Sequence, residues 1–235
     1  MIAVRKSGER GRADRDWLVA RPTFSFGTYQ DPKYNGFRSL RVLNDDRVAP
    51  GKGFGPHAHR DMEIISYVIE GRIVHRDSLG SRYVVGPNEV QTMSAGNGVV
   101  HSEFNASEND PLRLLQIWIE PVAEDLRPSY QQIAFDAHEK SGRFRLLAAP
   151  QSSDAKQWTM IHQDVRLYVS AVEREQRVAY AFLPQRHGWI QVVTGRVSLN
   201  GIPLEEGDGA AISDEQEVVI EGADGGGEIL LFDLA

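Results

Sequence analysis

Two pairs of metal-binding side chains constrain the fold of this chain more than any other feature of its sequence. His57 and His59 form the first pair, His101 and Glu103 form the second, and one residue separates the two members of each pair. On a β-strand, residues i and i+2 project from the same face, so each pair directs two ligands toward one point. If the two strands are neighbours or face each other across a barrel, three imidazoles and one carboxylate converge. We therefore expect strands at both pairs and one metal site between them.

The ligand types and their surroundings favour a metal site over unrelated histidines. Three nitrogen ligands and one oxygen ligand suit Fe, Ni, Cu, Mn or Zn better than Ca or Mg, which prefer all-oxygen ligands. A lone histidine is more often an ordinary surface or core residue than a ligand. Here three of the seven histidines fall into the two pairs, and both pairs follow glycine-rich segments, residues 50–56 and 94–100. Among the other histidines, His75 is expected at the surface or in an ion pair.

Short apolar segments separated by turn residues run through most of the chain. Residues 64–69 and 112–119 are typical of strands, and Glu70-Gly71 and Leu79-Gly80 are typical of hairpin turns. No long segment has the periodicity of an amphipathic helix. This pattern predicts an all-β fold, either a barrel or a sandwich.

The C-terminal half of the chain repeats the strand pattern of the N-terminal half. Residues 190–197 parallel residues 66–73, and residues 229–233 parallel residues 115–119. An internal repeat of this size predicts two similar domains, with the acidic, proline-flanked residues 121–128 as their connection. The second copy has no His-x-His or His-x-Glu pair, so we expect it to bind no metal.

Length and composition limit the classes of protein to which this chain can belong. Its 235 residues suit one large or two ordinary domains. A net charge of −7 argues against broad electrostatic binding to nucleic acid or to an anionic membrane. There is no cysteine, so the metal ligands have to be nitrogen and oxygen atoms. Because no apolar segment resembles a secretion signal or a membrane span, the expected location is cytoplasmic.

The motifs around the two ligand pairs resemble those of the pirin family of cupins. Two spacings resemble the general cupin motifs: Gly51…His57-x-His59-x-x-x-Glu63…Gly71, which has one extra residue before its last glycine, and Gly98-x-x-His101-x-x-x-Asn105. The closer resemblance to pirins extends over further segments: residues 24–26, 40–42, 44–46, 53–54, 61–63 and 93–98. It is densest over residues 2–120 and is nearest to the bacterial pirin-like quercetin 2,3-dioxygenases.

The resemblance implies an all-β bicupin, with two β-barrel domains of the double-stranded β-helix (jelly-roll) type. We expect an N-terminal metal-binding cupin domain over residues 1–125 and a C-terminal degenerate cupin domain without metal over residues 126–235. In pirins, the metal ligands carry over onto His57, His59, His101 and Glu103. In many other cupins the carboxylate ligand stands at the position of Glu63, so the choice between the two glutamates stays open.

The resemblance also implies an activity. The chain is expected to be a metal-dependent oxidoreductase with quercetin 2,3-dioxygenase activity, which cleaves quercetin or a related flavonol with dioxygen. Iron(II) is the first choice for the metal, with copper, nickel, manganese, cobalt and zinc as alternatives. Glu103 is the expected catalytic base for the substrate hydroxyl. We expect a flavonol-like substrate and dioxygen as partners, no direct contact with nucleic acid or membrane, and leave a protein partner open.

Two other classes of function are alternatives to the enzyme. Eukaryotic pirins look like metal-dependent binding modules that regulate transcription factors, and a metal- or redox-dependent module of this type would show little turnover. A purely structural bicupin is the third class, and the intact set of ligands argues against it. Oxygen consumption in the presence of a flavonol distinguishes the enzyme from both alternatives.

Overall fold

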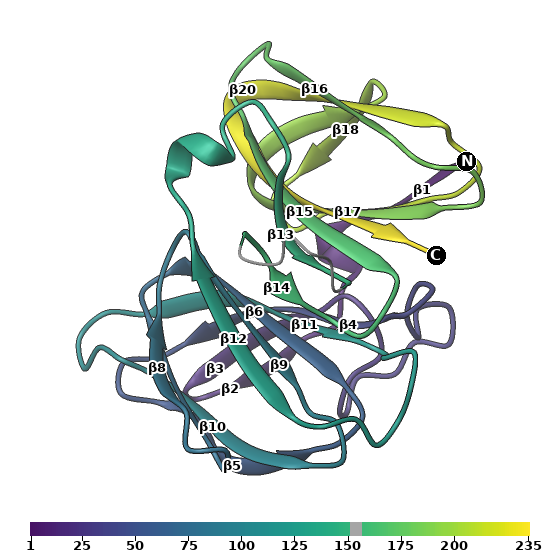
Figure 1. The fold of residues 1–235 in the computed structure, drawn as a ribbon. Helices are drawn as coiled ribbons and strands as arrows, with labels where there is room; N and C mark the ends of the chain where they lie inside the picture. The colour runs from purple at the N-terminus through teal and green to yellow at the C-terminus, as the bar shows by residue number, and fades with distance from the viewer. Residues whose placement is uncertain (151–156) are drawn as a thin grey trace. The chain divides into compact units, whose positions relative to one another are not determined.

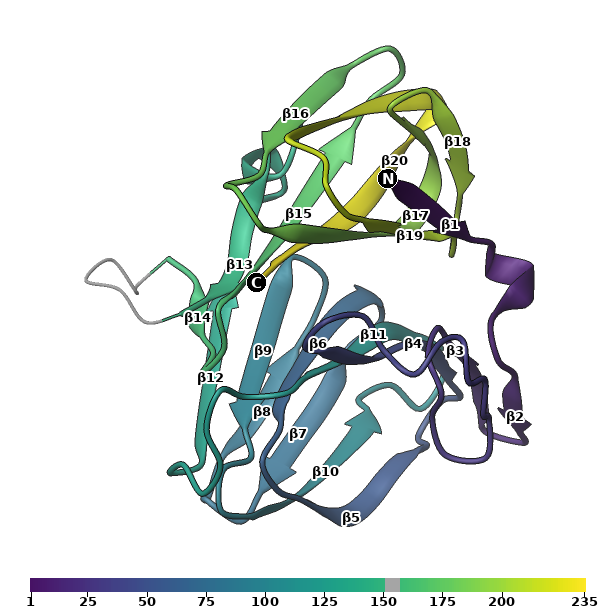
Figure 2. The same cartoon turned by 90° about the vertical axis from the view of Figure 1, so that its right-hand side faces the viewer.

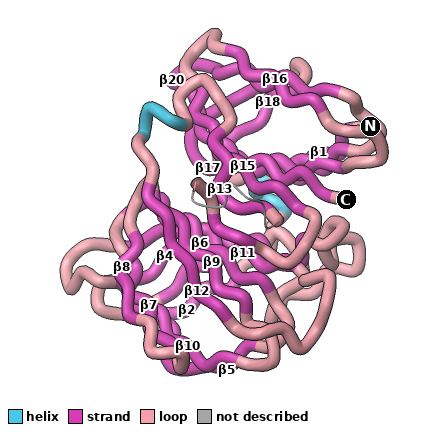
Figure 3. The backbone as a smooth tube through the Cα atoms, viewed as in Figure 1, coloured by secondary structure: helices cyan, strands magenta, loops and turns pink. Residues whose placement is uncertain are grey.

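The computed structural model describes residues 1–150 and 157–235. Strands dominate this part of the chain, and its only helices are two short 3-10 turns, η1 (Ser7–Glu9) and η2 (Ala137–Glu139) (Figure 3). The predicted all-β fold is therefore confirmed. No helix of the described residues is long and apolar enough to cross a membrane.

The described chain divides into two compact units, which we name after the part of the sequence that contributes most of each. The N-terminal barrel comprises Gly11–Phe135 and Pro150–Gln163. The C-terminal barrel comprises Met1–Arg10, Asp136–Ala149 and Asp164–Ala235. Each barrel has its own strands and its own buried interior, and each is described separately below.

Two antiparallel sheets build the N-terminal barrel (Figures 1 and 2). One sheet has the strand order β12-β9-β6-β11-β4-β3-β2, and the other has the order β5-β10-β7-β8. The strands of these sheets are β2 (Ala13–Arg15), β3 (Leu18–Pro22), β4 (Leu40–Val48), β5 (Gly53–His59), β6 (Glu63–Glu70), β7 (Ile73–Asp77), β8 (Arg82–Val85), β9 (Glu89–Ser94), β10 (Val99–Asn105), β11 (Leu112–Ile119) and β12 (Ser129–Ala134). The short strand β14 (Thr159–Met160) lies in the same unit but in neither of the two sheets.

Strand β10 shows how the sequence selects the inward face. Buried residues alternate with more exposed ones along this strand, and the side chains of Val100 and Phe104 face outward. Because successive side chains of a strand point to opposite faces, His101 and Glu103 are both directed into the barrel. The alternation of the sequence thus places one of the two predicted ligand pairs in the interior.

The C-terminal barrel is formed by strands with the order β1-β19-β17-β20-β15-β13, with β16 paired to β20 and β18 paired to β17. Its strands are β1 (Ile2–Arg5), β13 (Arg145–Ala149), β15 (Val165–Val172), β16 (Arg177–Ala181), β17 (His187–Leu199), β18 (Ile202–Glu205), β19 (Gly209–Ile212) and β20 (Glu217–Leu234). Its buried cluster consists of aliphatic residues and Phe182, so the interior is apolar.

The predicted internal repeat has a counterpart in two turns of the backbone. Gly71, which follows β6, has a φ of 76°, and Gly195 in β17 has a φ of 72°. A Cβ at either position would lie within 2.6 Å of a backbone carbonyl oxygen, that of Pro111 for Gly71 and that of Gly226 for Gly195. Only glycine combines this left-handed conformation with so close a backbone approach, which explains why the repeat retains a glycine at both positions.

The compact units are not continuous in sequence, unlike the predicted domains 1–125 and 126–235. Strand β1 pairs with β19 and therefore belongs to the C-terminal barrel. Strand β12, which begins at Ser129, pairs with β9 of the N-terminal barrel. Both strands cover sheet edges that would otherwise expose unpaired backbone groups, and this need is not visible in the local sequence.

Candidate metal centre

The two predicted ligand pairs lie on adjacent antiparallel strands. In the ladder between β5 and β10, His57 stands directly opposite His101, and His59 stands opposite Val99. The Nε2 atoms of His57 and His101 are 3.1 Å apart. Two ring nitrogens that face each other at this distance share either a proton or a metal ion.

Three imidazoles converge at this point of the N-terminal barrel. Ligand nitrogens of His57, His59 and His101 all lie within 4.8 Å of one another. The ring centroids are separated by 4.7 Å between His57 and His59, 4.5 Å between His57 and His101, and 4.9 Å between His59 and His101. His101 is buried, and the other two side chains are partly exposed to the cavity.

Burial keeps two of these histidines neutral. Burial, together with a smaller contribution from the neighbouring imidazoles, lowers the pKa of His59 to about 4 and the pKa of His101 to about 3. A neutral imidazole offers a lone pair, and a metal ion can bind it without first displacing a proton. The donor set therefore fits a divalent transition metal ion, for which imidazole is a common ligand.

Glu103 lines the same cavity but is held by other residues of the barrel. Its Oε1 accepts hydrogen bonds from Nε2 of Gln91 at 2.6 Å and from Oγ of Ser66 at 3.3 Å. Its Oε2 accepts a hydrogen bond from Nε2 of Gln116 at 2.6 Å. A carboxylate oxygen of Glu103 lies within 4.8 Å of ligand nitrogens of His75 and His101. Glu103 is not part of the group formed by His57, His59 and His101. Its role as fourth ligand stays a prediction.

The cavity in front of these side chains has a volume of about 360 Å³. The histidines and Glu103 line one part of it, and aromatic rings line another. Trp118 packs edge-on against His59, with ring centroids 4.8 Å apart, and Phe26 packs edge-on against Trp118 at 5.3 Å. A cavity of this size and composition accommodates a small aromatic molecule next to the histidines.

Comparisons with known proteins match this chain over its whole length. A sequence profile of the pirin family matches residues 3–119, and a profile described as the quercetinase C-terminal cupin domain matches residues 146–234. A quercetin 2,3-dioxygenase of Escherichia coli K12 is 44% identical, and the alignment covers 100% of this chain and 99% of that protein. The chain belongs to the pirin family. The predicted membership is confirmed, and the bicupin fold with it.

Other pirin relatives support the same assignment. A pirin-like protein of Caulobacter vibrioides is 39% identical, with full coverage of both chains. The crystal structure of the Escherichia coli pirin YhhW in complex with nickel(II) has a TM-score of 0.93 and 44% identity, and the match covers 100% of this chain and 99% of that one. A protein of the same fold thus binds a divalent metal ion.

In this pirin, Glu63 lies apart from the cavity lining. Ser94 donates a hydrogen bond to its Oε2 at 2.7 Å, and Nδ1 of His162 lies 3.1 Å from its Oε1. Burial raises the pKa of Glu63, although the hydrogen bonds from Ser94 and His162 oppose this effect. Of the two glutamates that the sequence left open, Glu103 is the one that lines the cavity with the three histidines.

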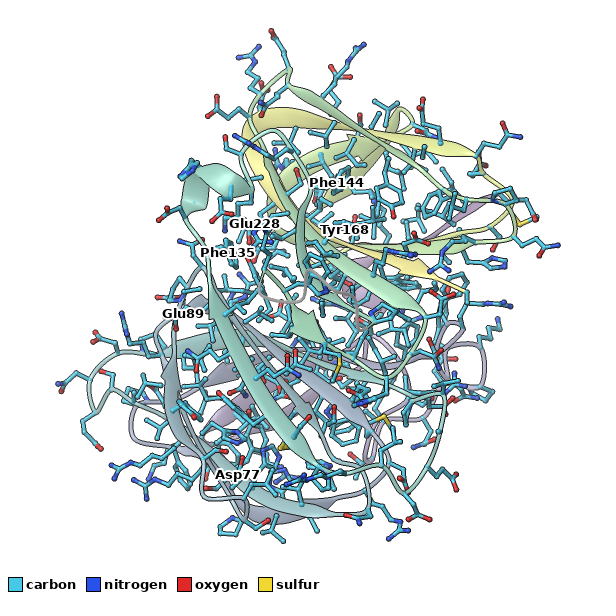
Figure 4. All side chains as sticks on the ribbon, in the orientation of Figure 1. Asp77, Glu89, Phe135, Phe144, Tyr168 and Glu228 are labelled. Atoms are coloured by element: carbon cyan, nitrogen blue, oxygen red, sulfur yellow. The ribbon has the colours of Figure 1, made fainter. Side chains whose placement is uncertain are left out.

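His75 is a residue of the site that the sequence reasoning missed. It is fully buried, its Nε2 lies 2.9 Å from Oδ2 of Asp77, and its ring packs against His101 with centroids 5.3 Å apart. Of the two expectations for this residue, the surface position is wrong, because the side chain is fully buried, whereas the expected contact with a carboxylate is present. Asp77, which Figure 4 labels, stands opposite His101 in the ladder between β7 and β10. The signal was present, because His75 and Asp77 have the same i, i+2 spacing as the two ligand pairs.

Two polar residues of β4 also line the cavity and were not predicted as site residues. Asn44 and Asp46 point to the same face of the strand and are each 3% exposed. Burial raises the pKa of Asp46 to about 8, and the charges of Asp45 and Glu103 contribute to the increase. Asp46 is therefore mostly a neutral carboxylic acid at pH 7.

Proposed function

We propose that this pirin is a metal-dependent dioxygenase that cleaves quercetin or a related flavonol with dioxygen. The main support is that neutral imidazoles and a buried carboxylate face one aromatic-lined cavity of about 360 Å³. The relatives named quercetin 2,3-dioxygenase, one of which is 44% identical over the whole chain, support the choice of substrate. Fold alone would not support it, because one fold hosts many reactions.

The metal we propose is a single iron(II) ion, held by His57, His59, His101 and Glu103. When bound, a metal ion of this kind supplies Lewis-acid stabilisation of an anionic substrate oxygen and a redox centre for dioxygen. Copper, nickel and zinc bind nitrogen and oxygen sites more tightly than iron or manganese. A preparation that takes up metal during expression can therefore carry an ion other than the active one.

The carboxylate of Glu103 is the proposed base that takes the proton of the substrate hydroxyl. The amides of Gln91 and Gln116 donate to both of its oxygens, and these bonds fix the carboxylate in the interior of the barrel. Hydrogen bonds of this kind hold the carboxylate in one orientation beside the histidines. From that position it can accept a proton from a hydroxyl that binds there.

The walls of the cavity have two further tasks in this proposal. Phe26, Phe54 and Trp118 offer aromatic surface to a flat ring system, and ring packing of this kind adds to the binding energy. The same side chains cover part of the cavity wall and so limit the access of water to the reacting groups.

The test is turnover by protein of defined metal content. The protein is stripped of metal, loaded separately with iron(II), nickel, copper, manganese, cobalt or zinc, and supplied with quercetin in air. We expect oxygen uptake with release of carbon monoxide, greatest with iron. If no metal form consumes oxygen with any flavonol of a panel, the dioxygenase proposal fails and a binding module becomes the better explanation.

A further inference from the structure

Two side-chain oxygens in the wall of the cavity have no hydrogen-bond partner among the described residues. They are Oδ1 of Asn44 and Oδ1 of Asp46, and only 3% of each residue is exposed. Buried polar atoms in proteins are nearly always hydrogen-bonded. Two unpartnered oxygens side by side in one cavity wall therefore indicate a place where a ligand supplies the missing partners.

The neighbours of these residues explain why no protein group fills that role. Asn44 stands opposite Gln116 in the ladder with β11, and the amide of Gln116 donates to Glu103. Asp46 stands between Ala20 on β3 and Leu114 on β11, which offer it no polar side chain.

The contrast with Asp45, the residue between them, shows that the missing partners are specific to the inward face. Asp45 points to the opposite face of β4, where Arg113 donates to both of its carboxylate oxygens at 3.0 and 2.8 Å. The acid outside the cavity thus has a paired cation, whereas the acid inside the cavity has none.

The chemistry of the two side chains defines the group that they can bind. The amide of Asn44 both donates and accepts hydrogen bonds. The carboxyl group of Asp46 places further hydrogen-bonding oxygens on the same face of β4. Together the two side chains match a hydroxyl or a carbonyl oxygen of a ligand.

We propose that Asn44 and Asp46 form a polar subsite that hydrogen-bonds a hydroxyl or carbonyl oxygen of the substrate, beside the oxygen that binds at the histidines. The subsite makes the protein prefer a polyhydroxylated aromatic substrate to one with a single hydroxyl group. That the ligand is a flavonol rests on the function proposed above. Sites built to hydrogen-bond a substrate group discriminate strongly against analogues that lack it.

The experiment compares two flavonols that differ only in their additional hydroxyl groups. Quercetin and 3-hydroxyflavone share the ring skeleton and the 3-hydroxyl and 4-carbonyl groups, and 3-hydroxyflavone lacks the other hydroxyls. Their affinities are measured by fluorescence titration of the zinc-loaded protein without oxygen, for wild type and for Asp46→Leu, Asn44→Leu and Asp46→Asn. Turnover of quercetin by the iron-loaded wild type is measured in parallel.

We expect wild type to bind quercetin more tightly than 3-hydroxyflavone. Asp46→Leu and Asn44→Leu should each weaken quercetin binding about 10- to 100-fold, as expected for the loss of a buried hydrogen bond. Their affinity for 3-hydroxyflavone should change less than about threefold. Asp46→Asn is the matched control, because an amide keeps both a donor and an acceptor, and it should retain the preference for quercetin.

The outcomes separate the subsite from the dioxygenase. If both leucine variants keep the wild-type ratio of the affinities for quercetin and 3-hydroxyflavone, the proposed subsite is wrong. Turnover of quercetin by wild type would in that case still support the proposed dioxygenase activity. If the preference disappears in the leucine variants but wild type turns over no flavonol, the subsite stands and the dioxygenase fails. Wild-type protein that binds neither flavonol overturns both. If Asp46→Leu does not fold, Asn44→Leu decides by the same criterion.

Discussion

The interiors of the two barrels differ at one row of neighbouring residues. In the N-terminal barrel, Ser66 on β6 stands opposite Gln116 on β11 and opposite Gln91 on β9. These three side chains, which we call the polar row, donate hydrogen bonds to the carboxylate of Glu103. The row therefore holds a buried carboxyl group next to the histidines.

The C-terminal barrel has an apolar row at the equivalent place. Ile190, which takes the place of Ser66 in the repeat, stands opposite Leu231 on β20 and opposite Ala210 on β19. All three side chains of this apolar row belong to the buried hydrophobic cluster of the barrel. The strand pairing around the two rows is the same, whereas the chemistry of their side chains is opposite.

This difference separates the determinants of the fold from the determinants of the site. Strand pairing depends on backbone hydrogen bonds and on the alternation of apolar residues, which both barrels satisfy. A functional site requires polar side chains at some inward positions, and these side chains must be hydrogen-bonded to one another because they are buried. Four expected effects test this comparison, and they follow from the largest to the smallest.

Removal of the paired histidines should abolish metal binding. In the double variant His57→Ala/His59→Ala only one imidazole of the group is left, and we expect the metal content, measured by elemental analysis, to fall from about one ion per chain to near zero. Thermal unfolding should show that the protein stays folded. Full metal occupancy in the variant, or a metal ion bound to the C-terminal barrel, would contradict the contrast between the two interiors.

Replacement of the carboxylate held by the polar row should lower turnover strongly. Glu103→Gln keeps the shape of the side chain but removes the base, so we expect kcat for quercetin to fall about 10²- to 10⁴-fold. Glu63→Gln is the matched control, because that glutamate lies outside the cavity lining, and it should cost far less. Wild-type turnover by Glu103→Gln, or an equal loss in both variants, would remove Glu103 from its proposed role.

Truncation of matching positions in the two rows should have unequal effects on stability. Ile190→Ala deletes buried aliphatic groups and leaves a cavity, so we expect the free energy of unfolding to fall by about 2–5 kcal/mol. Ser66→Ala removes one hydroxyl from a network that keeps two amide donors, and should cost about 0.5–1.5 kcal/mol. Denaturant unfolding measures both values. Equal costs would mean that the two interiors are stabilised in the same way.

The smallest effect concerns the attachment of the N-terminal segment to the C-terminal barrel. Burial alone raises the pKa of Asp208, but hydrogen bonds from Lys6 and from backbone N–H groups outweigh it and lower the pKa below the ordinary value of 3.8. A lowered pKa stabilises the fold above the ordinary value, and this stability is lost as the pH falls through the pKa of the folded state.

Asp208→Asn should therefore lower the stability of this barrel at pH 7 by about 1 kcal/mol, and should matter less in strong acid. Thermal unfolding of wild type and variant between pH 7 and about pH 2 measures the difference. A difference that does not shrink toward low pH would show that the charge of Asp208 has no part in the attachment.

The sequence by itself predicted the features that depend on local periodicity. The i, i+2 spacing placed His57 with His59 and His101 with Glu103 on strands, and the alternation of β10 directed the second pair inward. The repeat of Gly71 at Gly195 indicated two similar barrels. These predictions succeeded because side-chain direction along a strand is fixed by the strand itself.

The tertiary structure alone decided which strands lie next to each other and in which register. The donors to Glu103 come from three other strands, β6, β9 and β11, and nothing near Ser66, Gln91 or Gln116 in the sequence indicates that they share one carboxylate. Asp45 and Asp46 look alike in sequence, yet one pairs with Arg113 and the other faces the cavity. Cross-strand register is a property of the whole sheet, and a shift of one residue would exchange their surroundings.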